Sequence, residues 1–149
     1  MVTRLFPNLC TKFSKLFKRM KKQKTHRQKA IAKLDQVFSL WVRQQGASDH
    51  GHNTCYTCNV VKPVKELHAG HFVTRGKMAT RWDERNVKPQ CAACNIFRFG
   101  EAWKFGKRID QDHGEGTADE LHRIANEGRK YLTVELETLA EHYRRKLKQ

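Results

Sequence analysis

Two stretches in the N-terminal third of the chain carry apolar residues at helical spacing. The first stretch has basic side chains in most of its gaps and consists of Leu5, Leu9, Phe13, Leu16, Phe17 and Met20. The second consists of Ile31, Leu34, Phe38 and Trp41. This repeat predicts one or two amphipathic helices that end near Gln45 and Gly46. Packing of the apolar stripe on the protein body or on a partner chain is the favoured interpretation. Membrane association and an organellar transit peptide are the alternatives.

The middle of the chain changes to shorter segments. Leu67–Val73 predicts a short strand, and Arg81–Lys88 predicts a second strand or extended segment after a glycine-containing loop. Asn95–Arg108 is typical of a helix, and Asp110–Gly116 of a loop. This order predicts a strand–loop–strand–helix core.

The C-terminal part is predicted to be helical. Thr117 and Glu120 have the spacing of a capping box, which predicts a helix that runs through Glu127. Thr133 precedes a last helix, whose apolar face is Leu136, Leu139, Tyr143 and Leu147. Helices therefore flank a small core that contains strands, and the predicted fold class is α+β.

The 149 residues suit one compact domain with an extension. We predict a basic amphipathic helical arm over 1–46, a core over 47–109 and a C-terminal helical region over 110–149. Because 38% of the residues are hydrophobic and 30% are charged, a bound metal would help to hold a thin core. No run approaches the roughly 20 apolar residues of a membrane span, and no signal peptide is apparent. We therefore expect a cytoplasmic protein without membrane contact.

Positive charge is concentrated at the N-terminus. The net charge is +15, and residues 1–34 contain eleven Lys and Arg but no Asp or Glu. Such a distribution favours a polyanionic partner, most simply DNA. The residues that we expect to contact DNA are Lys12, Lys15, Lys18, Arg19, Lys21, Lys22, Lys24, Arg27, Arg75, Lys77 and Arg81.

Four of the five cysteines form two Cys-x-x-Cys pairs. Cys55 and Cys58 are separated from Cys91 and Cys94 by a 32-residue insert. Paired thiolates of this kind predict one tetrahedral structural zinc site, which fits a reducing compartment better than disulfides would. The fifth, Cys10, is expected to pack as a small apolar residue.

The insert and the residue after the second pair carry candidate catalytic groups. His71, on the predicted strand, is the candidate general base, and Asn95 offers an amide oxygen to a catalytic divalent ion, Mg²⁺ or Mn²⁺. Asn86 is predicted to bond the backbone across the loop and hold His71 in position. His68 would lie on the opposite face of an extended strand, so it reaches the same metal only if Ala69 and Gly70 bend the chain.

These residues carry a resemblance to a known family. The order strand–His–loop–Asn–Cys pair–Asn resembles the HNH, or ββα-metal, nuclease motif. The segments "CYTC", "HAGHF", "TRWDERNVKPQC" and "AACN" resemble the phage NinG/Rap recombination nucleases from about Asn53 to Gly100, with weaker similarity through the last helix. Recombination endonuclease VII is similar at the cysteine pairs, with Asn directly after the last Cys.

The resemblance implies an HNH core over 47–109, with His71 as base and Asn95 as metal ligand. It also implies cleavage of Holliday junctions and D-loops, and location in the host cytoplasm if a phage encodes the protein. Some family members have an acidic residue where this chain has His68, and an imidazole there favours Mn²⁺ or a later transition metal over Mg²⁺. Some also have a cysteine-rich N-terminal segment, where this chain has only Cys10.

The hypothesis is therefore a metal-dependent, structure-selective DNA endonuclease. A homodimer is expected because a junction is cut on two strands and each chain has one His71 and one Asn95. The alternatives are a less selective HNH nicking nuclease and a non-catalytic zinc-knuckle protein that binds DNA through its basic arm.

Overall fold

A computed structural model describes residues 23–148 of the chain. The predicted helix over residues 5–20 lies outside this range. So do Cys10 and six of the predicted DNA contacts, namely Lys12, Lys15, Lys18, Arg19, Lys21 and Lys22. In the described residues the fold is a mixture of helices and short antiparallel strands, which confirms the α+β prediction.

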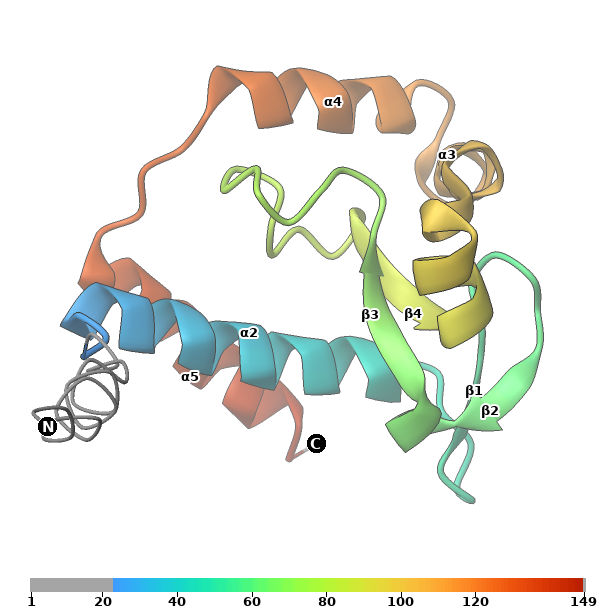
Figure 1. The fold of residues 1–149 in the computed structure, drawn as a ribbon, viewed down its shortest axis with the longest axis horizontal. Coiled ribbons are helices and arrows are strands. Elements are labelled where there is room, and N and C mark those ends of the chain that lie inside the picture. Colours follow the sequence, from blue (N-terminus) through green and yellow to red (C-terminus); the bar gives the residue numbers. More distant parts are fainter. Residues whose placement is uncertain (1–22, 149) are drawn as a thin grey trace, which may run out of the picture.

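An antiparallel hairpin lies at the centre of the fold (Figure 1). Strand β3 (Leu67–His71) pairs with β4 (Val87–Cys91) without a bulge, from Leu67 opposite Cys91 to His71 opposite Val87. The predicted second strand is present as β4, but it begins at Val87 and not at Arg81, because residues 80–86 form successive turns. The amide of Asp83 donates to Thr80, that of Asn86 donates to Asp83, and the Asp83 carboxylate accepts from the amide of Arg85.

Helices α2 (His26–Gln44) and α5 (Thr133–Lys146) lie side by side in Figure 1 and share one hydrophobic core. A capping box of Thr25 and Gln28 begins α2. The predicted apolar stripe of residues 31, 34, 38 and 41 packs on the body of the protein. The core residues from the two helices are Ala30, Leu34, Phe38, Trp41, Val42, Leu136, Ala140 and Tyr143.

Helices α3 (Ala102–His113) and α4 (Thr117–Glu127) form a second core with Phe72, Val73 and Tyr56. The single helix predicted from Asn95 is wrong in its first part, which is a π-helical turn, η2 (Ala93–Phe97), followed by a 3₁₀ turn, η3 (Phe99–Glu101). Helix α3 then continues to His113, so the predicted loop shortens to residues 114–116.

Helix α4 has the predicted end but not the predicted cap. Gly116 occupies the capping position with φ +85°, a left-handed conformation that glycine adopts without strain. Thr117 is the first residue of the helix and not its cap, and its hydroxyl donates backwards to the carbonyls of His113 and Gly114. The proposed capping box at Thr117 and Glu120 is therefore wrong.

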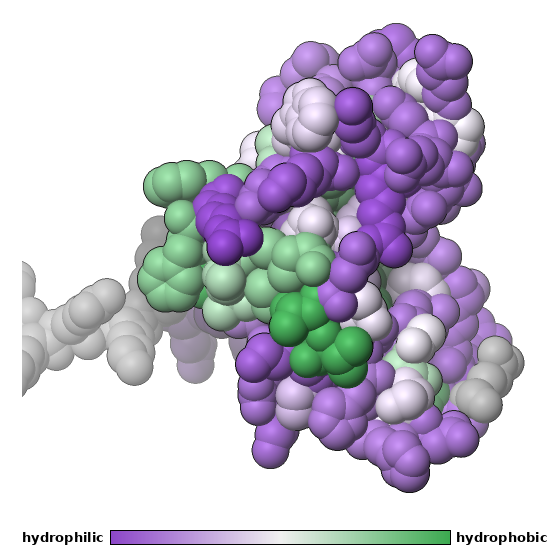
Figure 2. All heavy atoms as spheres, turned by 90° about the vertical axis from the view of Figure 1, so that its right-hand side faces the viewer, coloured by the Kyte–Doolittle hydropathy of each residue, from purple (hydrophilic) through white to green (hydrophobic). Residues whose placement is uncertain are grey.

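A second small hairpin, β1 (His52–Thr54) and β2 (Val61–Pro63), leads through the 3₁₀ turn η1 (Val64–Glu66) into β3. On the face that carries α3 and this hairpin, Figure 2 shows hydrophobic side chains gathered in one area with hydrophilic residues around it. No helix within residues 23–148 is long and apolar enough to cross a bilayer.

Candidate metal centre and active site

The four paired cysteines meet at one point, as predicted. The sulfur atoms of Cys55, Cys58, Cys91 and Cys94 all lie within 4.8 Å of one another, and Cys58 Sγ is 3.8 Å from Cys91 Sγ. Sulfurs about 2.3 Å from a tetrahedral metal ion would be about 3.8 Å apart. The cluster is therefore compatible with a structural metal site.

Backbone hydrogen bonds bring the two cysteine pairs together. Cys55 follows β1 and its amide donates to the Val60 carbonyl, which closes the first pair into a tight turn. The amide of Tyr56 donates to the carbonyl of Pro89 at 2.8 Å, so this turn is attached to β4 next to the second pair. Cys91 ends β4, and Cys94 lies in the π-helical turn.

The electrostatics of the cluster favour a bound cation. Burial raises the pKa of Cys58 to about 12, and the neighbouring cysteines act in the same direction. Burial opposes ionisation of Cys55 as well. Hydrogen bonds with the backbone of Cys91 and with Thr57 outweigh it and lower the pKa of Cys55 to about 6. The raised pKa of Cys58 reflects the cost of placing several thiolates in one small volume, and a bound cation would offset that cost.

His68 and Asn95 meet beside this cluster. The His68 Nδ1 atom is 3.0 Å from the Asn95 side-chain nitrogen, and both residues are half-buried. Turning the Asn95 amide over exchanges its nitrogen and oxygen, so the same geometry also presents the amide oxygen at this point. Two potential metal ligands therefore converge where the hairpin faces the π-helical turn.

His71 lies at the other end of β3, where its ring is fixed. Its Nε2 atom is 3.0 Å from the backbone carbonyl oxygen of Arg81. Burial lowers the pKa of His71 below its usual value, and the charges of Arg75 and Arg81 act in the same direction. The imidazole is consequently neutral at pH 7. When one ring nitrogen donates to the carbonyl, the other keeps the lone pair that a general base needs.

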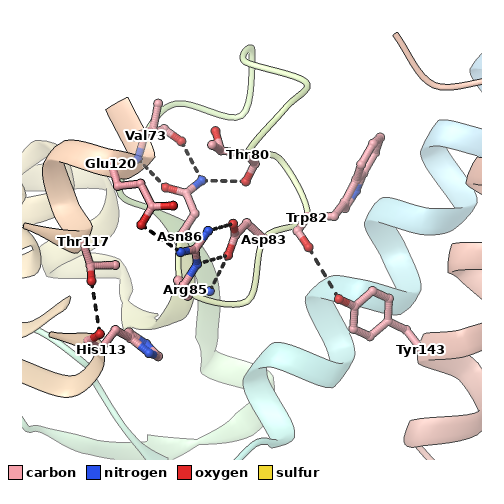
Figure 3. Close-up of polar contacts among 10 residues, drawn as sticks. All are labelled: Val73, Thr80, Trp82, Asp83, Arg85, Asn86, His113, Thr117, Glu120 and Tyr143. Atoms are coloured by element: carbon pink, nitrogen blue, oxygen red, sulfur yellow. Dashed lines mark hydrogen bonds and ion pairs between the residues drawn. The ribbon is translucent and has the colours of Figure 1, made fainter. Parts of the chain in front are cut away.

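Asn86 holds the loop that supplies this carbonyl (Figure 3). Its side chain is fully buried, accepts from the Val73 amide at 2.7 Å, and donates to the carbonyls of Val73 and Thr80 at 3.0 and 2.8 Å. The turn before Arg81 is thereby tied to Val73, the second residue after the end of β3. The hydrogen bonds that we predicted for Asn86 across the loop are confirmed.

Asp35 on α2 fixes the same loop from the other side. Its carboxylate accepts from the Arg81 guanidinium at 2.6 and 2.9 Å, from Arg75 at 3.0 Å and from the Trp82 indole at 3.0 Å. Burial disfavours ionisation of Asp35, but the two arginines outweigh it and its pKa is lowered. Asp35 carried no motif signal in the sequence, because its partners lie about 40 residues away.

The predicted catalytic residues therefore form two groups on one hairpin. His68 and Asn95 are close together at the cysteine end, whereas His71 and Asn86 are joined through the loop of residues 72–86. The bend that would put His68 and His71 on one face is absent, since β3 pairs regularly over its whole length. Gly70 keeps the strand flat against β4, where a side chain would collide with Gln90.

The basic residues that we expected to contact DNA and that the structure describes differ in their exposure and in their contacts within the protein. The Arg81 side chain is only 14% exposed and is engaged by Asp35, so its main role is structural. Arg75 is also bound to Asp35 but 63% exposed, and Lys77 donates to Asn126. Arg27 donates to the Tyr131 carbonyl, and Lys24 is exposed.

Comparison with known proteins identifies the family of the chain. A family model described as "Bacteriophage Lambda NinG protein" matches residues 10–149. The chain belongs to the NinG family. It is 27% identical over 95 residues to the "Protein ninG" of Escherichia phage 933W, and equally to that of Enterobacteria phage VT2-Sa. The match covers 63% of this chain and 46% of each relative, so it spans about half their length. No solved structure matches.

Proposed function

We propose that this NinG-family protein is a metal-dependent DNA endonuclease with an HNH core, stabilised by zinc at the four cysteines. Its substrates would be branched recombination intermediates such as Holliday junctions and D-loops. The observation that supports this most strongly is the fixed His71 ring. A buried amide, Asn86, holds a loop whose Arg81 carbonyl orients a neutral imidazole. A zinc-binding DNA-binding module would have no need of such an arrangement.

In the proposed reaction His71 removes a proton from a water molecule, whose oxygen attacks the phosphorus. The bond from phosphorus to the leaving sugar oxygen breaks, and that oxygen is finally protonated from solvent. The lowered pKa of His71 keeps the base unprotonated at neutral pH. His68 and Asn95 would hold a divalent ion at the cysteine end of β3. Because β3 does not bend, His68 faces away from His71, so the phosphate would have to lie between this ion and the water that His71 activates. Such an ion supplies positive charge at the phosphate and at the leaving oxygen.

The choice of metal follows from the donor atoms. Mg²⁺ prefers an all-oxygen environment, whereas an imidazole suits Mn²⁺ and later transition metals. Since His68 contributes nitrogen, we propose that Mn²⁺ supports cleavage better than Mg²⁺.

A homodimer is also part of the proposal. The apolar face of α5 packs on α2 of the same chain, so it is not free to form an interface. The homodimer is expected from the two-fold symmetry of a junction and from the single His71 in each chain. Light scattering with and without a four-way junction tests it, and a monomer on the junction would contradict it.

The first test measures cleavage and binding separately. We expect His71→Ala to slow cleavage by about 10²–10⁴-fold, because a positioned general base is lost. DNA affinity should be unchanged, since a neutral side chain is removed. His50→Ala, at an exposed histidine outside the site, is the matched control. Assays on a four-way junction, linear duplex and single strand distinguish the selective from the less selective nuclease. Cleavage by His71→Ala at the native rate would refute the proposal.

The second test concerns the metal ligands. Asn95→Ala should also fail to cut, but excess metal should partly restore it because a ligand and not the base is missing. His68→Asp replaces a nitrogen donor with oxygen, so the ratio of Mg²⁺-supported to Mn²⁺-supported rates should rise. An unchanged ratio would remove His68 from the metal site while leaving the role of His71 intact.

A further inference from the structure

The segment directly after Asn95 exposes an unusual amount of aromatic surface. Ile96 and Phe97 belong to the same π-helical turn as Asn95, and Phe99 and Trp103 follow within six residues. Phe99 is 91% exposed, Phe97 76% and Trp103 71%. We call residues 96–103 the aromatic segment. It belongs to the face on which Figure 2 shows hydrophobic side chains gathered among hydrophilic ones.

The backbone of the aromatic segment is held in an unfavourable conformation. Phe99, Gly100 and Glu101 are consecutive and all have positive φ, at +53°, +85° and +53°. For residues other than glycine this typically costs about 1–3 kcal/mol each and is found at functional sites. The buried Gln90 side chain donates to the Gly100 carbonyl at 2.9 Å and fixes the turn. The exposed rings are therefore presented by a fixed backbone.

Basic side chains alternate with these rings. Arg98 and Lys104 lie on either side of Phe99, and each forms an ion pair with Glu101 at 3.3 Å. The Lys107 ammonium lies 4.1 Å from the centre of the Trp103 ring. A shallow groove runs beside Trp103, and its lining includes the basic Lys104, Lys107 and Arg108, the polar Thr57 and Asn59, and the acidic Asp112.

This pattern indicates one class of occupant. A flat ring between cations stacks on a nucleobase while the cations contact the neighbouring phosphates, which is how proteins bind single-stranded nucleic acid. A protein partner would be expected to cover Phe99 with apolar groups and would have no use for the surrounding positive charge. Paired bases in continuous duplex do not offer their faces, whereas the displaced strand of a D-loop and the terminal base pairs of an open junction do.

We propose that the aromatic segment stacks on unpaired bases at the branch point of DNA, next to the phosphate to be cut. This inference rests on the proposed function, because Asn95 and the segment share one turn. Selectivity for branched DNA would then come from exposed base faces rather than from the basic N-terminal residues.

The test uses full-length, zinc-loaded protein in a His71→Ala background, so that the DNA stays intact. The substrates are a four-way junction and a single strand, each with 2-aminopurine, and a linear duplex. Phe99→Asn removes the ring and keeps a residue that tolerates positive φ. We expect affinity for junction and single strand to fall about 5- to 150-fold, with loss of 2-aminopurine quenching. Duplex affinity should change less than about twofold.

Leu132→Ala is the matched control, because this residue is 68% exposed but lies before α5, far along the chain from the segment. Phe97→Ala serves as a second variant, and circular dichroism with zinc content establishes folding of each. Equal loss on duplex and junction would overturn the inference. So would unchanged DNA affinity with an altered mass in light scattering, which would identify a contact between copies of the chain.

Cleavage by the unsubstituted protein is measured in parallel. If it cuts junctions while Phe99→Asn binds them normally, only this inference fails. If the rings stack on unpaired bases but no DNA is cut under any metal condition, the inference holds and the proposed nuclease function fails.

Discussion

The two ends of strand β3 carry candidate catalytic groups that are held in place by different means. At the cysteine end, His68 and Asn95 lie beside a cluster of four thiols that is compatible with a bound metal ion. At the other end, His71 depends on a buried amide and an ion-paired loop, with no metal ligand among them. The two ends share one hairpin but not one source of rigidity. A substitution at one end should therefore disrupt the structure of that end and leave the other end intact.

Two backbone hydrogen bonds report on the two ends. The amide of Tyr56 donates to Pro89 beside the cysteines, and the amide of Phe72 donates to Asn86 beside His71. Hydrogen exchange at these amides measures local opening at each end separately.

The largest effect is expected on loss of the metal. Cys58→Ser, or chelation, removes the metal-binding free energy, which in small metal sites is also folding free energy. Protection at Tyr56 should fall on the order of 100-fold or more, while Phe72 should lose much less. Elemental analysis should show stoichiometric zinc in the native protein and a loss in the variant.

His52→Ala is the control for this experiment, since it removes an exposed imidazole next to the first cysteine pair that is not part of the cysteine cluster. Full zinc content in Cys58→Ser would contradict the metal site. Equal loss of protection at Tyr56 and Phe72 would show that the metal holds the whole hairpin, and the contrast between the two ends would then be wrong.

The next effect comes from the buried amide. Asn86→Ala leaves the Val73 amide and carbonyl without partners, at about 1–3 kcal/mol for each buried group, whereas the Thr80 carbonyl keeps the Asp83 amide as a donor. We expect a loss of at least about 2 kcal/mol in the free energy of unfolding, measured in urea. Protection should fall at Phe72 first.

Asn126→Ala is the matched control, because Asn126 is an exposed asparagine on α4 whose side chain accepts from Lys77. It should change stability by less than about 0.5 kcal/mol. A variant at Asn86 as stable as this control would mean that water satisfies the loop carbonyls, and the amide would not position His71.

Local chemistry explains what the sequence could predict. Two Cys-x-x-Cys pairs must turn back on themselves, so the cluster of Cys55, Cys58, Cys91 and Cys94 follows from spacing alone. The stripe on α2 and the face of α5 follow from helical periodicity, because each must be buried against something. Asn86 was identified by its place between His71 and Asn95, where its side chain could bond the backbone across the loop.

Other features depended on distant contacts that no pattern encodes. The helix predicted from Asn95 is interrupted because Gln90 holds Gly100 in a left-handed turn, and this contact depends on the register of the hairpin. Exposure of Phe99 and Trp103 was missed for a related reason, since their spacing alone is equally typical of a buried helix face. Asp35 was missed because its arginine partners come from another element.

The smallest effect, and the sharpest for the His71 end, is expected at Asp35. Asp35→Asn keeps the size of the side chain and an acceptor for Trp82, but it removes the charge that holds the Arg81 guanidinium. The Arg81 carbonyl, and with it the His71 ring, should become less well placed. Small displacements of a catalytic group cost on the order of 10-fold in rate, less than loss of the base itself. We expect a slower single-turnover cleavage rate with unchanged zinc content, unchanged Tyr56 protection and no loss of DNA affinity.

Glu137→Gln removes an exposed negative charge that pairs with His26 on the surface, so it controls for net charge. If both variants cut at the native rate, Asp35 stabilises the loop without positioning His71.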